Sequence, residues 1–273
     1  MTRKLILITT AFLTYSSLAL GEKNLDLTHY GYAAYLGSGI YRTSDRTVKV
    51  YNIPMSYTAR GASESQWGIN IKFPVTVGFY NFDPSDIIDS GLPDKVETFT
   101  LIPGLELIIS LRKNWKILPF LDYGFGRNFE NDNTINIFAG GIRSLSDFDI
   151  GRKSTLTLSN RYYYVGQKEK NVQISSDFRA LENGVSLNPR YRLSFFGRPA
   201  DLHFHYVNFL YANLRFLRFR DEAFEIKMQN EAGFTFGLAK QKPLKIFDIP
   251  RIGLGYRWGD KLRVIRLIIG APY

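Results

Sequence analysis

From about Trp67 to the C-terminus, the chain repeats segments of about ten residues in which apolar and polar side chains alternate, and turn residues end each segment. The segment after Ala223 shows the pattern most clearly. Its apolar positions are Phe224, Ile226, Met228, Ala232, Phe234, Phe236 and Leu238, and between them lie Glu225, Lys227, Gln229, Glu231, Gly233, Thr235 and Gly237. Because the side chains of a strand alternate between its two faces, this segment predicts a strand that is apolar on one face and polar on the other. Such a strand suits any half-buried antiparallel sheet, so the rest of the sequence must decide the architecture.

The first 21 residues have the pattern of a secretory signal peptide. Met-Thr-Arg-Lys is a basic start, an apolar stretch follows, and Ala19-Leu20-Gly21 places small residues two apart before Glu22. Polar residues interrupt the apolar stretch, which is shorter than about 20 clean residues and therefore favours a cleaved signal over an anchoring helix. We expect cleavage after Gly21, with Ala19 as the alternative, and one mature domain over residues 22–273. Since no later stretch could span a membrane as a helix, a membrane-embedded form would be a β-barrel.

Composition agrees with an exported barrel. The chain has no cysteine, although disulfides are available outside the cytoplasm, and a closed barrel does not need them because it has no free strand edge. Aromatic residues make up 15%, with 17 Tyr and 21 Phe, as interfacial belts of a membrane barrel would require. The formal net charge is +10. Basic residues could bind anionic headgroups such as lipopolysaccharide phosphates, or could simply be spread through lumen and loops. Nucleic-acid binding is not indicated, because there is no recognition helix, zinc site or basic arm.

Alternation and turn residues together predict an all-β, antiparallel up-and-down transmembrane β-barrel of about 12 strands. The predicted strands cover 30–42, 46–58, 67–80, 95–110, 116–127, 134–144, 153–165, 182–196, 201–216, 223–239, 249–259 and 261–273. The two longest connections, 81–94 and 166–181, fall on the same side, as the outer loops of an even-stranded barrel do. Five prolines lie inside predicted strands, namely Pro54, Pro74, Pro103, Pro119 and Pro189. Since proline cannot donate a hydrogen bond to a neighbouring strand, we expect them at bulges or rims.

The last predicted strand ends in an aromatic residue with apolar residues at every second position before it. These residues are Ile265, Leu267, Ile269, Ala271 and Tyr273. The arrangement resembles the C-terminal signal of bacterial outer-membrane barrels, and that resemblance implies recognition by the barrel assembly machinery. An ordinary amphipathic edge strand would have the same alternation and is the alternative interpretation.

Charged residues occupy the polar faces of the predicted strands. A charge on the lipid face of a barrel costs about 2–4 kcal/mol at the middle of the membrane, so these residues are expected to point inward. The predicted lumen-lining residues are Lys72, Glu106, Asp122, Arg161, Arg190, Arg192, Glu225, Lys227, Glu231, Arg251, Arg257 and Arg266, and Arg143 joins them. Because both signs of charge are present, we expect ion pairs that set the electric field in the lumen.

The sequence offers only weak candidates for chemistry. His203 and His205 share one strand face next to Asp201, and two His with an Asp could bind a transition metal. Two ordinary lumen or rim residues would have the same spacing, so no metal site is assigned. Ser159 and Asn160 lie on a different predicted strand from His203 and have no motif around them that indicates a hydrolase. No phosphate-binding loop appears. We therefore predict no catalytic residue, no cofactor and no enzyme.

Four segments resemble those of a known family. They are Gly31-Tyr-Ala-Ala-Tyr-Leu-Gly-Ser-Gly-Ile-Tyr-Arg42, Leu101-Ile-Pro-Gly-Leu-Glu-Leu107, Leu121-Asp-Tyr-Gly-Phe-Gly126 and Leu158-Ser-Asn-Arg-Tyr-Tyr-Tyr164. The chain resembles the solitary outer-membrane autotransporter-like β-barrel family over nearly all of residues 22–273. The resemblance implies a twelve-strand plan with no passenger domain ahead of it. Since only residues 22–29 precede the first predicted strand, we do not expect passenger secretion to carry over, and the function of the family is itself undefined.

These observations lead to one expectation about function. We expect an integral outer-membrane barrel of a Gram-negative bacterium, exported through a cleaved signal peptide, with a structural, pore or surface-interaction role. Its expected partners are membrane lipid, lipopolysaccharide and the barrel assembly machinery. Two alternatives stay open, an outer-membrane hydrolase that modifies lipid or lipopolysaccharide, and a soluble periplasmic β-barrel that binds a ligand.

Overall fold

The computed structural model describes twelve ranges of the chain. They are residues 34–35, 37–42, 47–80, 98–129, 134–151, 154–169, 175–189, 193–195, 198–219, 222–238, 251–260 and 262–270. The predicted signal peptide, residues 1–21, lies outside these ranges, as does the terminal Tyr273. Within them, no helix has the length and apolarity that a membrane crossing requires.

The described residues form eighteen strand segments. Their bounds are β1 Gly39–Arg42, β2 Thr47–Ile53, β3 Ser56–Arg60, β4 Gly68–Lys72, β5 Val75–Tyr80, β6 Thr98–Leu101, β7 Gly104–Arg112, β8 Trp115–Asn128, β9 Thr134–Ile150, β10 Ser154–Glu169, β11 Ser175–Asn188, β12 Leu193–Phe195, β13 Arg198–Ala212, β14 Arg215–Phe219, β15 Glu222–Glu225, β16 Met228–Leu238, β17 Ile252–Gly259 and β18 Leu262–Ile269.

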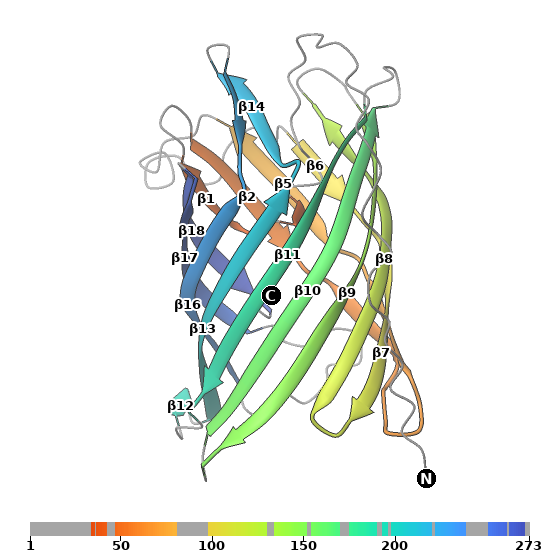
Figure 1. The fold of residues 1–273 in the computed structure, drawn as a ribbon, viewed down its shortest axis with the longest axis vertical. Coiled ribbons are helices and arrows are strands. Elements are labelled where there is room, and N and C mark those ends of the chain that lie inside the picture. The colour runs from red at the N-terminus through yellow and green to blue at the C-terminus, as the bar shows by residue number, and fades with distance from the viewer. Residues whose placement is uncertain are drawn as a thin grey trace, which may run out of the picture.

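The strands close into one antiparallel barrel of twelve strands, which confirms the predicted barrel and its strand number. Long strands such as β9, β10 and β11 wind obliquely around the barrel (Figure 1). The first and last strands close it, because Gly39 to Arg42 of β1 lie opposite Arg266 to Arg263 of β18. At one end of the barrel β14 and β15 form a separate hairpin, and at the other end β12 pairs with the start of β13.

Three barrel strands are interrupted at proline. Pro54 separates β2 from β3, Pro74 separates β4 from β5, and Pro103 separates β6 from β7. Pairing continues in register across each interruption: Ile53 lies opposite Val75 and, beyond the break, Ser56 lies opposite Lys72. Each pair of segments is therefore one barrel strand with a local break, because proline has no N–H to donate.

The other two prolines have different positions. Pro119 lies inside β8, and the β7–β8 pairing is interrupted opposite it, between the Glu106–Phe120 and Ile109–Ile117 pairs. Pro189 directly follows the end of β11, so it does not interrupt a strand. All five prolines thus fall at a break, a pairing gap or a strand end.

The outer surface of the barrel is largely apolar, and several charged groups are buried in its interior. On β18, Arg266 is buried between Val264 and Ile268, whereas Ile265 and Leu267 are exposed on the opposite face. Large apolar side chains are exposed on the other strands too, and Leu121 is the most open of them with 75% of its surface accessible. This distribution is the reverse of that in a water-soluble domain.

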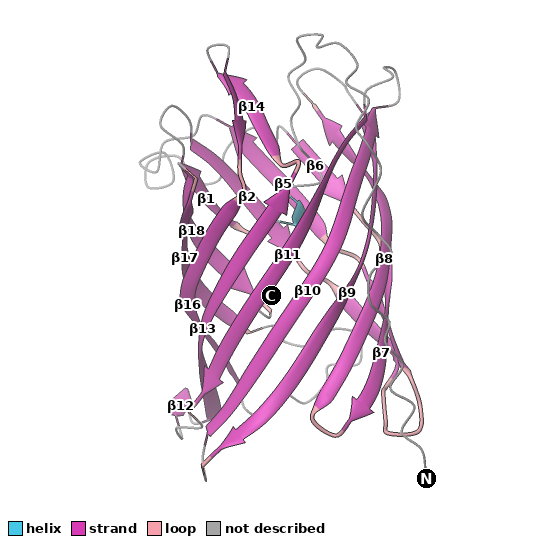
Figure 2. Ribbon diagram, in the orientation of Figure 1, coloured by secondary structure: helices cyan, strands magenta, loops and turns pink. Residues whose placement is uncertain are grey.

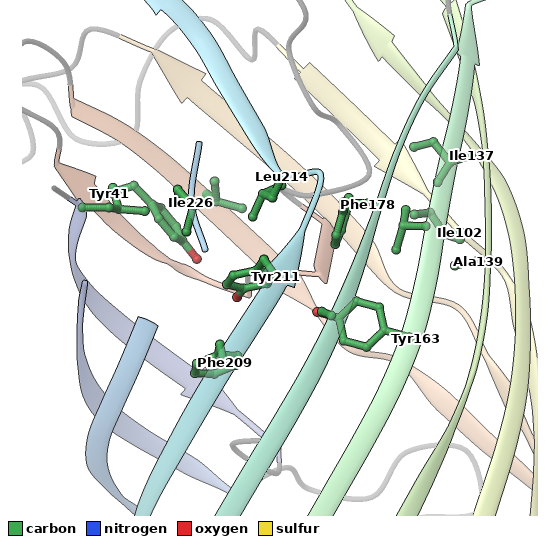
Figure 3. Packing of buried hydrophobic residues seen from close by; sticks show 14 of the residues in the cluster. Tyr41, Ile102, Ile137, Ala139, Tyr163, Phe178, Phe209, Tyr211, Leu214 and Ile226 are labelled. Carbon is green, nitrogen blue, oxygen red and sulfur yellow. The ribbon is translucent and has the colours of Figure 1, made fainter. Parts of the chain in front are cut away.

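The interior is not uniformly wet, contrary to the expectation of polar inner faces. A cluster of buried apolar residues joins side chains from opposite walls, including Tyr41, Ile137, Phe178, Phe209 and Ile226. Figure 3 shows these side chains projecting into the barrel from several strands. The cluster fills part of the lumen, because inward positions near the β14–β15 end are apolar rather than charged.

Several predicted boundaries were wrong. Among the described residues of the predicted strand 30–42, only Gly39–Arg42 form a strand, and Ala34 and Tyr35 are helical instead. The predicted loop 166–181 is largely strand, because β10 continues to Glu169 and β11 begins at Ser175. The Gly- and Ala-rich strand 134–144 extends to Ile150 as β9. Pairing with β10 stabilises the added parts of β9 and β11 despite their weak apolar alternation.

Candidate functional site in the barrel interior

A segment just before β1 lies inside the barrel. We name Ala34, Tyr35, Gly37 and Ser38 the interior segment. Ala34 and Tyr35 have helical backbone and pack against the apolar cluster, and this short piece is visible within the ring of strands (Figure 2). Asn52 of β2 holds the segment: its Nδ2 donates to the Ala34 carbonyl at 2.8 Å, and its main-chain N–H donates to Ser38 Oγ at 2.7 Å.

Tyr35 connects the interior segment to a buried ion pair on the wall. Its hydroxyl donates to Asp122 Oδ2 at 2.6 Å, and Lys72 Nζ lies 2.7 Å from Asp122 Oδ1. Burial, the Asp122 charge and this hydrogen bond together raise the pKa of Tyr35 well above its ordinary value. The phenol therefore keeps its proton and remains a donor to the carboxylate.

Aromatic rings surround the guanidinium of Arg161 beside Tyr35. Its Cζ lies 4.5 Å from the ring centroid of Tyr163, 5.0 Å from that of Phe120 and 5.5 Å from that of Tyr35. The rings of Tyr35 and Tyr163 stack at 5.3 Å. Glu182 of β11 accepts a hydrogen bond from the Tyr163 hydroxyl at 2.9 Å and lies 3.6 Å from Arg161 Nη1. Cation–π contacts and one carboxylate thus stabilise a charge that burial would otherwise penalise.

A second charged cluster centres on Glu231 of β16, whose side chain is fully buried. Arg257 Nε donates to Glu231 Oε2 at 2.9 Å, and Arg266 Nη1 donates to both carboxylate oxygens, at 3.0 Å and 2.7 Å. His205 Nε2 lies 3.4 Å from Oε1. Arg257 also lies over the ring of Phe209 at 3.8 Å. Two guanidinium groups therefore share one carboxylate.

Two glycines make room for these clusters. A Cβ at Gly104 would collide with the carboxylate of Asp122, so only glycine lets that side chain lie across β7. A Cβ at Gly37 would lie 2.7 Å from Arg266 Nη2, and Gly37 has a φ of +83°, which L side chains rarely adopt. Both positions let backbone and charged side chain approach closely.

A cavity of about 220 Å³ lies between the interior segment and the wall. Its lining includes charged groups from both clusters: Lys72, Asp122, Arg161, Glu182, Arg257 and Arg266. Since the ion pairs described above already engage these groups, the cavity is a narrow, charge-compensated space inside the barrel.

The structure brings most of the predicted lumen residues into the interior. Buried residues among them are Glu106, Asp122, Glu231, Arg257 and Arg266. Lys72 and Arg161 are partly buried in the contacts described above. Arg143 Nη2 donates to Glu106 Oε2 at 2.8 Å, and Arg251 donates to the Asp201 carbonyl at 3.0 Å. Arg190 and Arg192 lie outside the described residues.

Glu225 and Lys227 do not lie in the interior. Their side chains are exposed, and Lys227 Nζ lies 3.4 Å from Glu225 Oε2. The alternation of side chains between the two faces changes phase here. Glu225 ends the separate hairpin, and residues 226–227 are not strand. Ile226 therefore points into the apolar cluster, while Met228 faces outward. The alternation read straight through residues 224–238 was therefore wrong at its start.

The histidine pair lies in the barrel wall without a cluster of metal ligands around it. His205 is buried beside Glu231, and His203 is partly buried. Among the described residues, no group of three or more His, Cys, Asp or Glu side chains could hold a metal ion. Ser159, on β10, is buried, and its Oγ has no hydrogen-bond partner within the described part of the chain.

Two important interior residues were missed by sequence reasoning. Tyr35 was placed on a predicted strand, although the Gly- and Ala-rich stretch around it alternates weakly, and that weakness was the available signal. Glu182 was overlooked because the strand that carries it was predicted to begin there, which left no alternation on its N-terminal side. Neither residue can be recognised in the sequence unless it is known which strands become neighbours.

Comparison with known proteins shows a structural likeness to solved β-barrels. No protein-family model matches the sequence, and no curated protein matches it. Among solved structures, the β domain of the Bordetella autotransporter BrkA matches with a TM-score of 0.51 and 10% identity, covering 85% of this chain and 92% of that chain. This chain has an autotransporter-like β-barrel fold. At 10% identity the likeness concerns the fold of the barrel alone.

Proposed function

We propose that this protein is an integral outer-membrane β-barrel of a Gram-negative bacterium whose lumen is closed by its own interior segment and which performs no catalysis. The observation that carries the proposal is the inverted polarity of a closed barrel. Leu121, Ile252 and Ile265 are each more than half exposed on the outside, whereas Glu231 and Arg257 are buried inside. Lipid is the solvent that suits such an outer surface, and a closed barrel satisfies its backbone hydrogen bonds within it.

The closed lumen supports a structural or surface-interaction role over that of an open pore. Among the described residues, the interior segment, the apolar cluster and the two charged clusters fill part of the barrel. The cavity beside the interior segment, of about 220 Å³, is smaller than the usual range for sites that bind drug-sized ligands. This also weighs against a soluble ligand-binding barrel, which would in addition expose too much apolar surface to water.

An enzymatic role has less support. Ser159 lies on β10 and His203 on β13, and β11 separates these two strands. A nucleophile and its base must lie within hydrogen-bond reach of each other.

Export through the signal peptide and recognition by the barrel assembly machinery complete the proposal. The outward positions of Ile265 and Leu267 on the last strand support the second of these.

Migration on gels tests the proposal directly. A folded membrane barrel resists unfolding by detergent at room temperature, so the purified protein is expected to shift its migration on boiling. Membrane fractionation is the companion measurement, in which the protein should require detergent for release. A protein that is released without detergent and shows no shift would contradict the membrane assignment. Wild-type lipid turnover above background would contradict the absence of catalysis.

A further inference from the structure

Two exposed arginines lie directly opposite each other on the outside of the barrel. Arg42 ends β1 and Arg263 lies near the start of β18, and the two are register partners. Both side chains are exposed on the faces that carry Ile40 and Ile265, which form the next outward pair. They belong to the outer surface, apart from the charged groups of the interior.

Like charges directly opposite each other on neighbouring strands are destabilising. Within the described residues, neither arginine makes an ion pair. The nearest described carboxylate in sequence, that of Asp260, accepts hydrogen bonds from the main-chain N–H groups of Lys227 and Met228, at 2.7 Å and 2.6 Å. The pair therefore offers two adjacent guanidinium groups to an external anion.

The position of the pair indicates the kind of anion. Trp258 of β17 is the register partner of Arg263 and stacks on Tyr256 at 5.8 Å. Tryptophan and tyrosine gather where a bilayer meets water, at the level of the lipid headgroups. Below this level the outer surface is apolar, through Ile265 and Leu267. An anion at this height on a membrane barrel is the phosphate of a lipid headgroup, which arginine binds with a matching two-pronged geometry.

We propose that Arg42 and Arg263 form a clamp for a phosphate of the lipid A headgroup in lipopolysaccharide. The inference rests on the proposed outer-membrane location. The clamp spans the junction between β1 and β18, where the barrel closes over four residue pairs. A bound phosphate replaces repulsion between two arginines with attraction across this junction, so lipid binding stabilises barrel closure.

This stabilisation is measured as the temperature at which the gel band of the folded protein disappears on heating. The full chain is folded in detergent with added lipid A that carries both phosphates, or with lipid A from which they have been removed. Phosphorylated lipid A should raise the midpoint temperature of the wild type. The R42Q/R263Q variant should lose that rise and bind phosphorylated lipid A roughly 10- to 30-fold more weakly. Without lipid this variant should fold at least as well as wild type, because it lacks the repulsion.

The matched control removes the same charge from the opposite end. Arg112 and Lys116 are exposed near the β7–β8 turn, and R112Q/K116Q should respond to lipid A as the wild type does. A full response by R42Q/R263Q, or an equal response of the wild type to dephosphorylated lipid A, would overturn the clamp. A wild type with no heat-modifiable form would refute the proposed function itself, and the clamp with it. R42K/R263K, which keeps the charge without the two-pronged geometry, should respond less than wild type.

Discussion

Tyr35 and Glu231 each provide hydrogen-bond or ion-pair partners for charged groups that are buried away from bulk water. The phenol of Tyr35 completes the surroundings of Asp122, and the carboxylate of Glu231 is shared by Arg257 and Arg266. A buried charge is tolerated only when it is paired and hydrogen-bonded, so removing one partner leaves the other exposed to the full cost of burial. These two residues therefore determine whether the interior can hold its charges.

Replacing Tyr35 by Phe removes the hydrogen bond and keeps the ring. We expect the free energy of unfolding to fall by about 1.5 kcal/mol, the lower end for a hydrogen bond to a charged group, because Lys72 still pairs with Asp122. Urea unfolding followed by gel shift measures the change. Tyr123→Phe is the control, since Tyr123 lies next to Asp122 on β8 and is 64% exposed on the outer surface. Equal effects of both variants would contradict the role of Tyr35.

Replacing Glu231 by Gln leaves two buried guanidinium groups without their shared carboxylate. Loss of one partner of a buried ion pair costs about 3–5 kcal/mol, so we expect a large fall in the free energy of unfolding. The same unfolding measurement applies. Glu225→Gln removes an equal charge from an exposed pair and should change stability by less than about 0.5 kcal/mol. A mild effect of Glu231→Gln would mean that the cluster is not important for stability.

The inward or outward position of a single residue could be predicted where the alternation along its strand continued, and not elsewhere. Glu106, Asp122 and Arg257 were placed on inward faces correctly, because the local alternation next to each of them keeps its phase. Lys227 was misplaced because a two-residue gap between β15 and β16 changes the phase, and a one-residue slip moves every side chain to the other face. Tyr35 could not be predicted, because its partners come from β8 and β10, far along the chain.

At the scale of elements, proline and pairing decide where strands begin and end. Pro54, Pro74 and Pro103 interrupt strands that nevertheless continue in register. Such breaks could be expected from the chemistry of proline. The length of β9 could not, since its later half, through Asp147 and Asp149, carries little apolar alternation and is held by long pairing with β10. Elements with strong alternation were predicted well, and elements formed mainly by their neighbours were not.

The β14–β15 hairpin gives an element-scale test of orientation. An epitope inserted between residues 220 and 221 should be detected by antibody on intact cells. In an up-and-down barrel the β13–β16 connection lies at the same end as the β5–β6 connection, residues 81–94, which the sequence predicts to be an outer loop, and surface hairpins tolerate insertions. The same epitope between Lys113 and Asn114, in the β7–β8 turn, should be detected only after permeabilisation. The reverse pattern of accessibility would show that the barrel is oriented the other way.

At the scale of the whole molecule, a barrel of twelve strands has a wider interior than the eight-stranded barrels that side chains alone can fill. The segment contributes Ala34 and Tyr35 to the apolar cluster and Ser38 to the bonding of Asn52. The filling of this part of the lumen is thus a property of the interior segment as much as of the wall.

Deleting residues 22–36 should open the lumen while leaving the wall intact. We expect the variant to keep a heat-modifiable form and to show larger single-channel conductance in planar bilayers than the wild type. The strand pairings of β1 begin at Gly39, outside the deletion, so closure of the barrel does not depend on the removed residues. Tyr35→Ala is a smaller change that should raise conductance less. Unchanged conductance in the deletion variant would mean that the apolar cluster alone blocks the lumen.

A closed ring of strands becomes an open sheet when any one junction separates, so its persistence is governed by the junction that opens most easily. In the described part of the chain, the paired residues of β1 and β18 run only from Gly39 to Arg42, with one further main-chain hydrogen bond from Leu267 to Ser38, whereas β10 pairs with β11 from Thr155 to Lys168. Hydrogen exchange of folded protein should therefore be fastest at Ile40 and Arg42 among the paired barrel strands. Exchange there as slow as in β10 would contradict this. Fast exchange at β1 would mean that the first and last strands set the lifetime of the closed barrel, although most of its wall consists of the long central strands.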